Sequence, residues 1–369
     1  MKIAVFYNLN FGGAKRAVYE QVKRLKNLGH LIDVYTTDFQ IDTLDISKVA
    51  SNSYRYKYSS FDQKIPFLSR LVNDIKVFRF LNTLHAEIAH DIDSRKYDIV
   101  LVHPDKYTQS PYILRHLRTR NVYYCQEPLR IVFEYVLRAK MNVGLLKYIY
   151  ELITRYIRKK IDIENVRSAT FTIASCYHIR ERMIEAYGVY PYVSYLGIDI
   201  ETFRPLKIKK KNQVFFVGNK DVWNDGYELV QKSLELIPSK IRPKLKVVSW
   251  VKENNERLTE NELVKQYNES FATLCLSRFE TFGLVPLESL SCGTTVIATR
   301  VSGHRETIAE DSGGYLVEFD QNEIAKLIER LSKYKKSSIK ARAYIKKYWD
   351  WDKKIIDLEK LLLFLSKYK

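Results

Sequence analysis

Cysteine is scarce in this chain, because only four of its 369 residues are cysteines and they lie far apart in the sequence. Cys125, Cys176, Cys275 and Cys292 form no CxxC pair and have no spacing typical of metal ligands. Two of them stand in or beside apolar stretches. These features exclude a disulfide framework and predict buried free thiols in a reducing cytosol.

Long apolar runs are also missing from the sequence. No segment approaches the roughly 20 apolar residues of a membrane-spanning helix, and the run that follows Met1 is too short for a secretory signal peptide. The composition is nevertheless that of a globular protein, with 46% hydrophobic and 28% charged residues. A chain of this length predicts two α/β domains, and we expect them in the cytoplasm.

Negative charge is under-represented, since 43 Asp and Glu residues face 61 Lys and Arg residues, for a net charge of +18. Such an excess favours polyanions or an anionic membrane surface as partners. No nucleic-acid-binding motif accompanies the charge. We therefore expect no nucleic acid as a partner, and a nucleic-acid-binding protein stays an alternative that the charge alone supports.

The segment 129–160 combines this charge with apolar side chains. Its Lys and Arg residues are interleaved with aromatic and aliphatic ones, and Gly144 is its only helix breaker. A basic amphipathic segment of this kind suits peripheral contact with the inner face of an anionic membrane. It equally suits a pair of packed helices with a solvated basic face, so both interpretations stay open.

A strand–turn–helix–strand pattern lies in the second half of the chain. The apolar runs 271–276 and 295–298 predict two buried strands, with a glycine-containing turn and a short helix between them. The start of such a helix attracts a phosphate group. Glu280 and Glu288 flank that start, and carboxylates accept hydrogen bonds from hydroxyls. Phosphate flanked by hydroxyls indicates a sugar nucleotide as the ligand.

The same residues resemble the signature of the retaining GT-B glycosyltransferases of family 4. The resemblance is carried by the stretch from Glu280 to Ala298, by 302–306 and by 313–317. It implies an α/β fold of the GT-B type. In that fold two Rossmann-like domains face each other across a cleft, and a C-terminal helix crosses back to the N-terminal domain.

The resemblance also implies a domain organisation. The segment 197–205 matches the turn that closes the first domain, and the lysine-rich linker 207–211 follows it. We expect an N-terminal Rossmann-like acceptor-binding domain at 1–205 and a C-terminal Rossmann-like nucleotide-sugar-binding domain at 206–347. A C-terminal crossover helix at 348–369 would complete the chain.

Roles for the signature residues follow from the resemblance. Glu280 would meet the sugar as a catalytic residue, and Glu288 would hold the ribose of the donor. Backbone N–H groups would bind the sugar and the diphosphate, and they belong to Phe282, Gly283 and Leu284. Retaining enzymes of this fold usually need no metal, and no cluster of metal ligands is visible in the sequence. We therefore expect neither a metal nor a further cofactor.

A pair of glycines follows the first predicted strand. Gly12 and Gly13 lie at its carboxyl end, where open α/β sheets bind ligands. A plain tight turn is the alternative. The family has a Gly-Gly turn here, which implies a donor contact for Gly13 and an acceptor contact for Gly12.

Polar residues end two further predicted strands in the first half of the chain. His103 ends one, and Gln126 with Glu127 ends the next. The family often has a histidine at position 126, whereas glutamine hydrogen-bonds but takes no proton at neutral pH. We predict His103 and Gln126 as catalytic candidates and Glu127 as an acceptor-side residue. A structural role is the alternative for His103.

The chain departs from the family pattern after the strand 214–218. The family has an arginine and a lysine here, and these two cations hold the donor diphosphate. Asn219 and Asp225 stand at the two positions. Asn219 and the neighbouring Lys220 remain donor-binding candidates, with an exposed loop lysine as the alternative for Lys220.

Together, these features predict a retaining hexosyltransferase. It would move a hexose from a nucleotide-sugar to a glycan or lipid-linked acceptor in the synthesis of a cell-surface polysaccharide or glycolipid. The lost cations leave a weak or inactive sugar-nucleotide binder as an alternative, and a nucleotide-sugar isomerase is another. A glycosidase with two acid/base carboxylates fits less well, because it does not explain the helix start between them.

Overall fold

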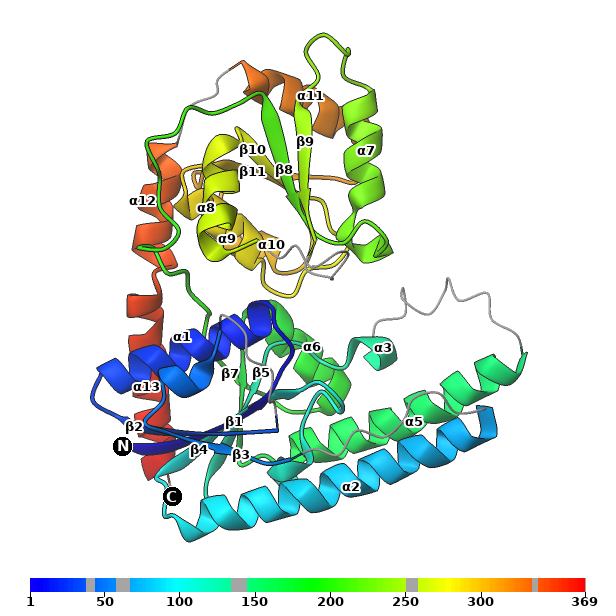
Figure 1. Ribbon diagram of the computed structural model, residues 1–369, viewed down its shortest axis with the longest axis vertical. Coiled ribbons are helices and arrows are strands. Elements are labelled where there is room, and N and C mark those ends of the chain that lie inside the picture. The colour runs from blue at the N-terminus through cyan, green and yellow to red at the C-terminus, as the bar shows by residue number, and fades with distance from the viewer. Residues whose placement is uncertain (38–43, 58–66, 134–144, 250–257, 334–337, 369) are drawn as a thin grey trace. The chain divides into compact units, whose positions relative to one another are not determined.

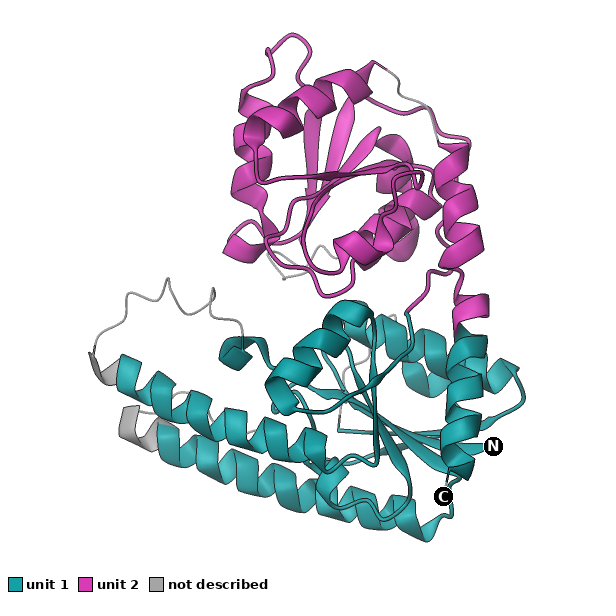
Figure 2. Ribbon diagram, turned by 180° about the vertical axis from the view of Figure 1, so that it is seen from behind, with its two compact units in different colours: residues 1–195, 355–369 teal, residues 196–354 magenta. Residues whose placement is uncertain are grey.

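The computed structural model describes residues 1–37, 44–57, 67–133, 145–249, 258–333 and 338–368 (Figure 1). They form two compact units (Figure 2). Unit 1 comprises residues 1–195 and 355–369, and unit 2 comprises residues 196–354. Each unit contains a parallel β-sheet covered by helices, so the predicted α/β class with two Rossmann-like domains is confirmed.

Unit 1 is built on a seven-stranded parallel sheet with the strand order β3-β2-β1-β4-β5-β6-β7. Its strands are β1 (Lys2–Asn8), β2 (Leu31–Thr36), β3 (Asn52–Arg55), β4 (Ile99–Asp105), β5 (Asn121–Cys125), β6 (Phe171–Ala174) and β7 (Tyr192–Val193). The central strands are apolar along most of their length, because helices cover both faces of a parallel sheet. All seven residues of β4 are buried.

The helices of unit 1 include two long ones that lie side by side (Figure 1). They are α2 (Phe67–Ser94) and α5 (Leu145–Arg167). The others are α1 (Gly13–Asn27), α3 (Arg130–Phe133) and α6 (Tyr177–Tyr187), with 3-10 turns η1 (Ile46–Lys48) and η2 (Tyr112–Arg115). In the described part of the chain, no helix has the length and hydropathy of a bilayer-spanning segment.

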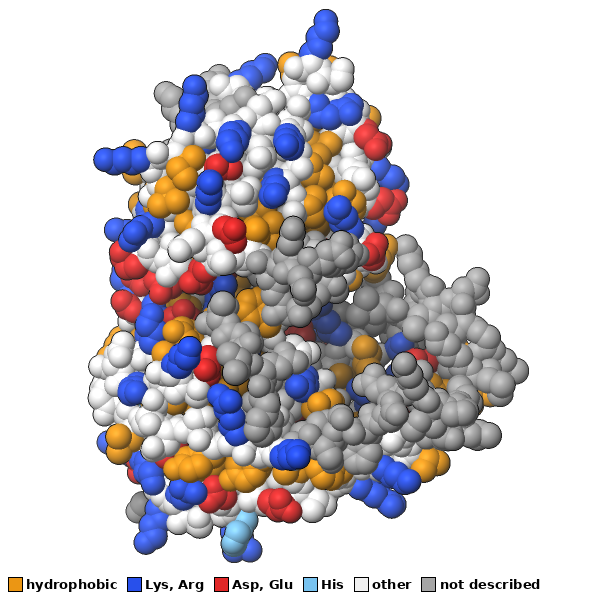
Figure 3. Space-filling view, in the orientation of Figure 1, with side chains coloured by type: hydrophobic (Ala, Val, Ile, Leu, Met, Phe, Trp, Pro, Cys, Tyr) orange, Lys and Arg blue, Asp and Glu red, His pale blue; other side chains and the backbone are white. Residues whose placement is uncertain are grey.

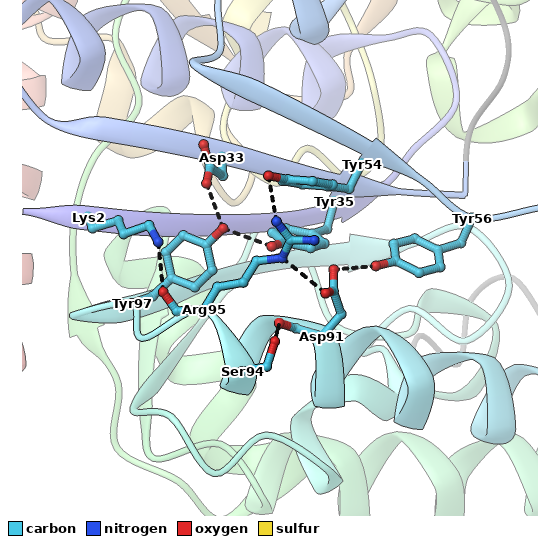
Figure 4. A network of polar contacts seen from close by, with 9 residues as sticks. All are labelled: Lys2, Asp33, Tyr35, Tyr54, Tyr56, Asp91, Ser94, Arg95 and Tyr97. Atoms are coloured by element: carbon cyan, nitrogen blue, oxygen red, sulfur yellow. Dashed lines mark hydrogen bonds and ion pairs between the residues drawn. The ribbon is translucent and has the colours of Figure 1, made fainter.

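A network of tyrosines holds the edge strand β3 against the end of α2 (Figure 4). The rings of Tyr35 and Tyr54 stack with centroids 4.8 Å apart. The Arg95 guanidinium lies 4.1 Å from the centre of the Tyr54 ring and donates to Asp91 at 3.0 Å. The Tyr56 hydroxyl donates to the same carboxylate at 2.6 Å. This edge of the sheet is therefore closed by its own side chains.

Unit 2 has a five-stranded parallel sheet with the order β12-β11-β10-β8-β9. Its strands are β8 (Gln213–Val217), β9 (Lys244–Val248), β10 (Ala272–Cys275), β11 (Thr295–Thr299) and β12 (Gly314–Val317). Its helices are α7 (Tyr227–Glu235), α8 (Glu260–Glu269), α9 (Leu284–Ser291), α10 (His304–Thr307), α11 (Gln321–Ser332) and α12 (Ile339–Tyr348), with a 3-10 turn η3 (Trp223–Asp225). The predicted strand–turn–helix–strand pattern is β10, α9 and β11.

The core of unit 2 follows from the alternation of side chains along its strands. Val214 and Phe216 of β8 belong to one apolar cluster with Val230 of α7 and Ile324 of α11. Phe215 points to the other face, where its ring meets Tyr267 of α8 at 5.2 Å. The sheet is therefore packed on both faces, as a parallel sheet requires.

The C-terminal helix α13 (Trp351–Lys367) begins in unit 2 and belongs to unit 1 from Ile355 onward. In unit 1, Glu359 lies 2.7 Å from the Nε2 atom of His30, and the ring of Tyr368 meets Phe171 at 5.9 Å. The predicted return of this helix to the N-terminal domain is confirmed.

The two units divide after Tyr195, ahead of the predicted boundary at 205. The reason is that the segment after Tyr195 is bonded to unit 2. The Arg342 guanidinium of α12 donates to the carbonyl oxygens of Ile200 at 2.6 Å and Phe203 at 2.7 Å. The assignment of acceptor binding to one domain and donor binding to the other stays a prediction.

Candidate active site

The turn between β10 and α9 is held in place by the segment that follows β11. The N–H of Gly303 donates to the carbonyl of Glu280 at 2.9 Å. A Cβ atom on Gly303 would lie 2.6 Å from the Phe282 Cα atom, so only glycine fits this approach. Gly283 has φ +96° and leaves 3.1 Å between an added Cβ atom and the ring of His304. The turn is thus fixed by close backbone packing.

The start of α9 carries no capping side chain. Gly283 is its N-cap, and its first turn contains no acidic residue. The N–H groups of Leu284 and Val285 precede the first intrahelical hydrogen bond, so the helix itself offers them no acceptor. Free N–H groups and the helix dipole together favour an anion at this point.

The two glutamates of the signature differ in access. Glu280 is half-buried, and its carboxylate accepts one long hydrogen bond, 3.5 Å from the N–H of Phe282. Glu288 is only 4% exposed, and the Tyr267 hydroxyl donates to its Oε2 atom at 2.7 Å. Burial, followed by the charge of Glu288, raises the pKa of Tyr267 well above its ordinary value. Glu280 therefore offers its carboxylate to a ligand more readily than Glu288.

The turn after β8 contains the two other donor-binding candidates of unit 2. The N–H of Asn219 donates to the Asp225 carboxylate at 2.7 Å, which closes the turn on itself. Lys220 is exposed, and its ammonium lies 5.7 Å from the centre of the Tyr227 ring. Asp225 thus stabilises the turn by accepting this hydrogen bond, at a position where the family has a cation.

Two hydrogen bonds join this turn to the signature. The N–H of Arg278 donates to the carbonyl of Asn224 at 2.8 Å, and the Asn224 amide donates to the carbonyl of Phe279 at 3.0 Å. The Arg278 guanidinium lies 4.6 Å from the Trp223 ring and 5.5 Å from the Phe319 ring. Sequence reasoning missed Arg278, although its place two residues before Glu280 was a signal.

In unit 1, the glycine pair lies at the start of α1. Gly12 is the N-cap, and its carbonyl accepts a hydrogen bond from Arg16 at 3.0 Å. Apart from its chain neighbours, no described residue has an atom within 4 Å of an added Cβ atom at Gly12, so the space beside it is open. The side-chain amide of Gln126 donates to the carbonyl of Ala14 at 3.2 Å. The structure therefore brings Gln126 to the start of the helix that Gly13 opens.

His103 lies within β4, in the interior of unit 1. Its side chain is fully buried, and neither ring nitrogen has a hydrogen-bond partner among the described residues. Burial lowers the pKa of His103 to about 3, so its imidazole is neutral at physiological pH. Glu127 is half-buried and forms an ion pair with Arg130 at 2.8 Å. The three polar residues predicted at strand ends therefore occupy different surroundings.

A buried polar cluster at the end of β1 and β4 escaped the sequence analysis. The Asn8 amide donates to Asp105 at 2.8 Å, and the His85 Nε2 atom lies 3.8 Å from the same carboxylate. Burial outweighs the charge of Asp105 and lowers the pKa of His85 to about 4. Within the described residues, no group of three or more His, Cys, Asp or Glu side chains is placed to hold a metal ion.

The surface of unit 1 includes an apolar stripe on α5. It consists of Tyr148, Ile149, Leu152, Ile153 and Tyr156, whose exposed fractions range from 40% to 71%. Spacings of three to four residues place these side chains on one side of the helix. Of the predicted basic segment 129–160, residues 134–144 lie outside the described ones. Elsewhere, Lys and Arg side chains are scattered over both units on the face that Figure 3 shows.

Residues 252–348 match the model of the family described as "Glycosyl transferases group 1". D-inositol 3-phosphate glycosyltransferase of Streptosporangium roseum is 40% identical over 72 residues, which are 19% of this chain and 17% of that protein. Alpha-maltose-1-phosphate synthase of Mycolicibacterium smegmatis is 31% identical over 101 residues, 26% of this chain and 25% of that protein. The chain thus matches a quarter or less of the length of these relatives.

Solved structures are similar over almost the whole chain. Sucrose-phosphate synthase from Thermosynechococcus elongatus has a TM-score of 0.70 at 16% identity and covers 99% of this chain and 98% of its own. Anabaena HepE in complex with UDP-glucose has a TM-score of 0.69 at 14% identity, over 98% and 99% of the two chains. WaaG, a glycosyltransferase involved in lipopolysaccharide biosynthesis, has a TM-score of 0.64 at 14% identity, again over 98% and 99%. At such identities the similarity identifies the fold.

Proposed function

We propose that the chain transfers a hexose from a nucleotide-sugar to an acceptor with retention of the anomeric configuration, because residues 252–348 match the model of the glycosyl transferases group 1 and the chain has the GT-B fold. The start of α9 carries this proposal. It presents free N–H groups beside the half-buried carboxylate of Glu280, and both are fixed by the packing of Gly303.

The geometry of this turn suits the chemistry of the transfer. The bond between the sugar C1 atom and the diphosphate breaks, and a bond from C1 to an acceptor oxygen forms. The acceptor hydroxyl loses its proton to solvent, and the diphosphate departs with one more negative charge. The N–H groups of Gly283 and Leu284, two of the three predicted donors, would stabilise that charge together with the N–H of Val285. The third predicted donor, Phe282, instead points its N–H at Glu280. Glu280 would stabilise positive charge on the sugar ring. Glu288 would hold the ribose.

We assign the donor to residues 206–347 and the acceptor to residues 1–205. The open space beside Gly12 supports an acceptor contact there. Gln126, which lies at the start of α1, would position the reacting sugar by hydrogen bonds, and Gly13 would approach the donor. His103 would have no direct contact with a substrate, because its side chain is buried, and its role would be to stabilise the packing of β4.

The donor specificity can be tested with a panel of UDP-, GDP- and ADP-hexoses and a set of glycan and lipid-linked acceptors. A transferase releases the nucleoside diphosphate, and the anomeric coupling constant of the product reports retention. An inactive binder would bind a donor without turnover, and an isomerase would convert it without releasing the diphosphate. Failure to bind any of these donors would contradict the proposal.

We further propose that the acceptor is lipid-linked, as in cell-surface polysaccharide or glycolipid synthesis, and that the protein binds the cytoplasmic face of an anionic membrane. The apolar stripe on α5 supports this proposal, because exposed aliphatic and aromatic side chains on one helix face suit a membrane interface. Lys159 and Lys160 follow the stripe and are exposed, so they can contact anionic headgroups.

The structure refines the choice of charge reversals for a membrane test. Arg155 and Arg158 donate to the carbonyl oxygens of Ile131 and Tyr107, so changing them would also disturb the fold. Lys159→Glu and Lys160→Glu break no hydrogen bond of this kind, although the Lys159 ammonium lies 5.8 Å from the centre of the Phe133 ring. The double variant should lose sedimentation with anionic liposomes, whereas Lys326→Glu with Lys340→Glu in unit 2 should retain it. Unchanged binding of the first pair would contradict attachment through α5.

A further inference from the structure

A positive charge is missing where the proposed reaction needs one. A departing diphosphate gains negative charge, and a cation beside it stabilises the transition state. The turn after β8 supplies none at positions 219 and 225, since Asn219 and Asp225 are bonded to each other. Lys220 lies over the ring of Tyr227 at the start of α7.

Arg278 is an exposed cation at the same edge of the sheet. It follows β10 and precedes Glu280 by two residues, and its backbone is bonded to Asn224 in the turn after β8. Two aromatic rings from other loops lie beside its guanidinium. They are Trp223 at 4.6 Å, in the loop after β8, and Phe319 at 5.5 Å, in the loop after β12. Three loops at the carboxyl ends of β8, β10 and β12 thus surround one charge.

The surroundings of Arg278 leave its charge available. A guanidinium that lies against aromatic rings keeps its N–H edge free, and that edge can bind two phosphate oxygens at once. Among the described residues, no carboxylate lies within ion-pair distance of Arg278. Arg300, which follows the neighbouring strand β11, is instead paired with Glu318 at 3.1 Å.

We propose that Arg278 binds the diphosphate of the nucleotide-sugar donor, together with the N–H groups at the start of α9. The inference rests on the proposed function and names the cation that the turn after β8 lacks. Trp223 and Phe319 position the guanidinium. Lys220 then contributes less to donor binding than Arg278.

The test is calorimetric titration of the full-length protein with UDP, GDP and ADP and with the matching nucleosides. Arg278→Leu should weaken the affinity for the diphosphate roughly tenfold to a hundredfold, as expected for charge-assisted hydrogen bonds. It should leave the affinity for the nucleoside unchanged. Arg278→Lys should recover part of the loss, and the control Arg300→Leu should bind like the wild type.

Three outcomes would overturn the assignment. Arg278→Leu could bind the diphosphate like the wild type, or it could lose the nucleoside equally, which would indicate a structural role. Lys220→Leu could also lose more affinity than Arg278→Leu. If the wild type binds none of the three diphosphates, the proposed function itself is contradicted, and that result is distinct from the other outcomes.

Discussion

Helices α1 and α9 both follow the carboxyl end of a buried parallel strand, and both have glycine as N-cap without a side-chain cap. Their surroundings differ. Space is open beside Gly12, whereas a Cβ atom added at Gly283 would lie 3.1 Å from His304 and 3.3 Å from Thr307. The enclosed turn holds its N–H groups in one geometry, as the stabilisation of a defined anion requires. The open turn leaves room for ligands of different shapes.

The two units also differ in their buried ionisable groups. Unit 1 encloses His85 and His103, neither of which has a ring nitrogen hydrogen-bonded to another described residue. Unit 2 encloses His304, whose Nδ1 atom lies 3.0 Å from the carbonyl of Thr299. We therefore expect unit 1 to be the more sensitive to acid.

The largest expected effect concerns Glu280. Glu280→Gln removes the charge beside the start of α9, and we expect transfer to fall roughly 1,000-fold. The melting temperature of Glu280→Gln should match that of the wild type, because the Glu280 side chain accepts only one long hydrogen bond. Glu310→Gln, at an exposed carboxylate after α10, is the matched control and should retain turnover. Retained turnover in Glu280→Gln would remove this residue from the active site.

The next effect contrasts the two turns directly. In Gly303→Ala the new methyl group would meet the Phe282 Cα atom, so the turn must shift. We expect kcat/KM to fall roughly 100-fold, since small displacements of a positioned group have effects of that size. In Gly12→Ala the new methyl group meets none of the described residues beyond its chain neighbours and introduces backbone strain alone, so the loss of kcat/KM should be smaller. A larger loss of kcat/KM in Gly12→Ala than in Gly303→Ala would refute the contrast between an enclosed and an open turn.

A smaller effect is expected from acidification. The pKa values of His85 and His103 are lowered by burial to about 4 and about 3, so both stay neutral in the folded protein. The unfolded chain takes up protons below a pH of about 6.5. Their contribution to stability is therefore present above that pH and is lost as the pH falls toward 4.

The pH dependence of the urea midpoint tests this expectation. His103→Leu should flatten the loss of stability between a pH of about 6.5 and about 4. Asp162 acts in the opposite direction, because burial raises its pKa to about 6 and its contribution is lost as the pH rises through that value. An unchanged slope in His103→Leu would show that this histidine does not carry the effect.

The smallest effect is expected at the edge of unit 1. Arg95→Leu removes the contact with the Tyr54 ring and the bond to Asp91. For a partly exposed arginine the stability loss should be about 1 kcal/mol. Transfer activity should not change, since this network closes the sheet edge. A loss of activity at full stability would assign the network a function that the fold does not indicate.

Most of the architecture could be predicted from the sequence, because short apolar runs bounded by glycine are local signals. The helix α6 begins at Tyr177 and ends before Gly188, whose φ of +67° is a common helix end. The pattern of β10, α9 and β11 was equally clear. The return of α13 to unit 1 followed from the resemblance to a known family.

The surroundings of the site residues could not be predicted, because they depend on contacts between distant segments. The hydrogen bond from Tyr267 to Glu288 joins two helices, and the packing of Gly303 on Phe282 joins two loops. His103 ended an apolar run in the sequence, yet β4 continues to Asp105 and encloses it. Arg278 acquires its aromatic neighbours only when three loops meet.

The central claim is that the start of α9 binds the donor diphosphate. Hydrogen exchange of the Gly283, Leu284 and Val285 amides, with and without UDP, GDP or ADP, tests it most directly. A diphosphate that binds should slow the exchange of these amides, while the start of α1 serves as the internal comparison and should change less. Binding of a diphosphate that leaves the exchange at Gly283–Val285 unaltered would contradict the claim.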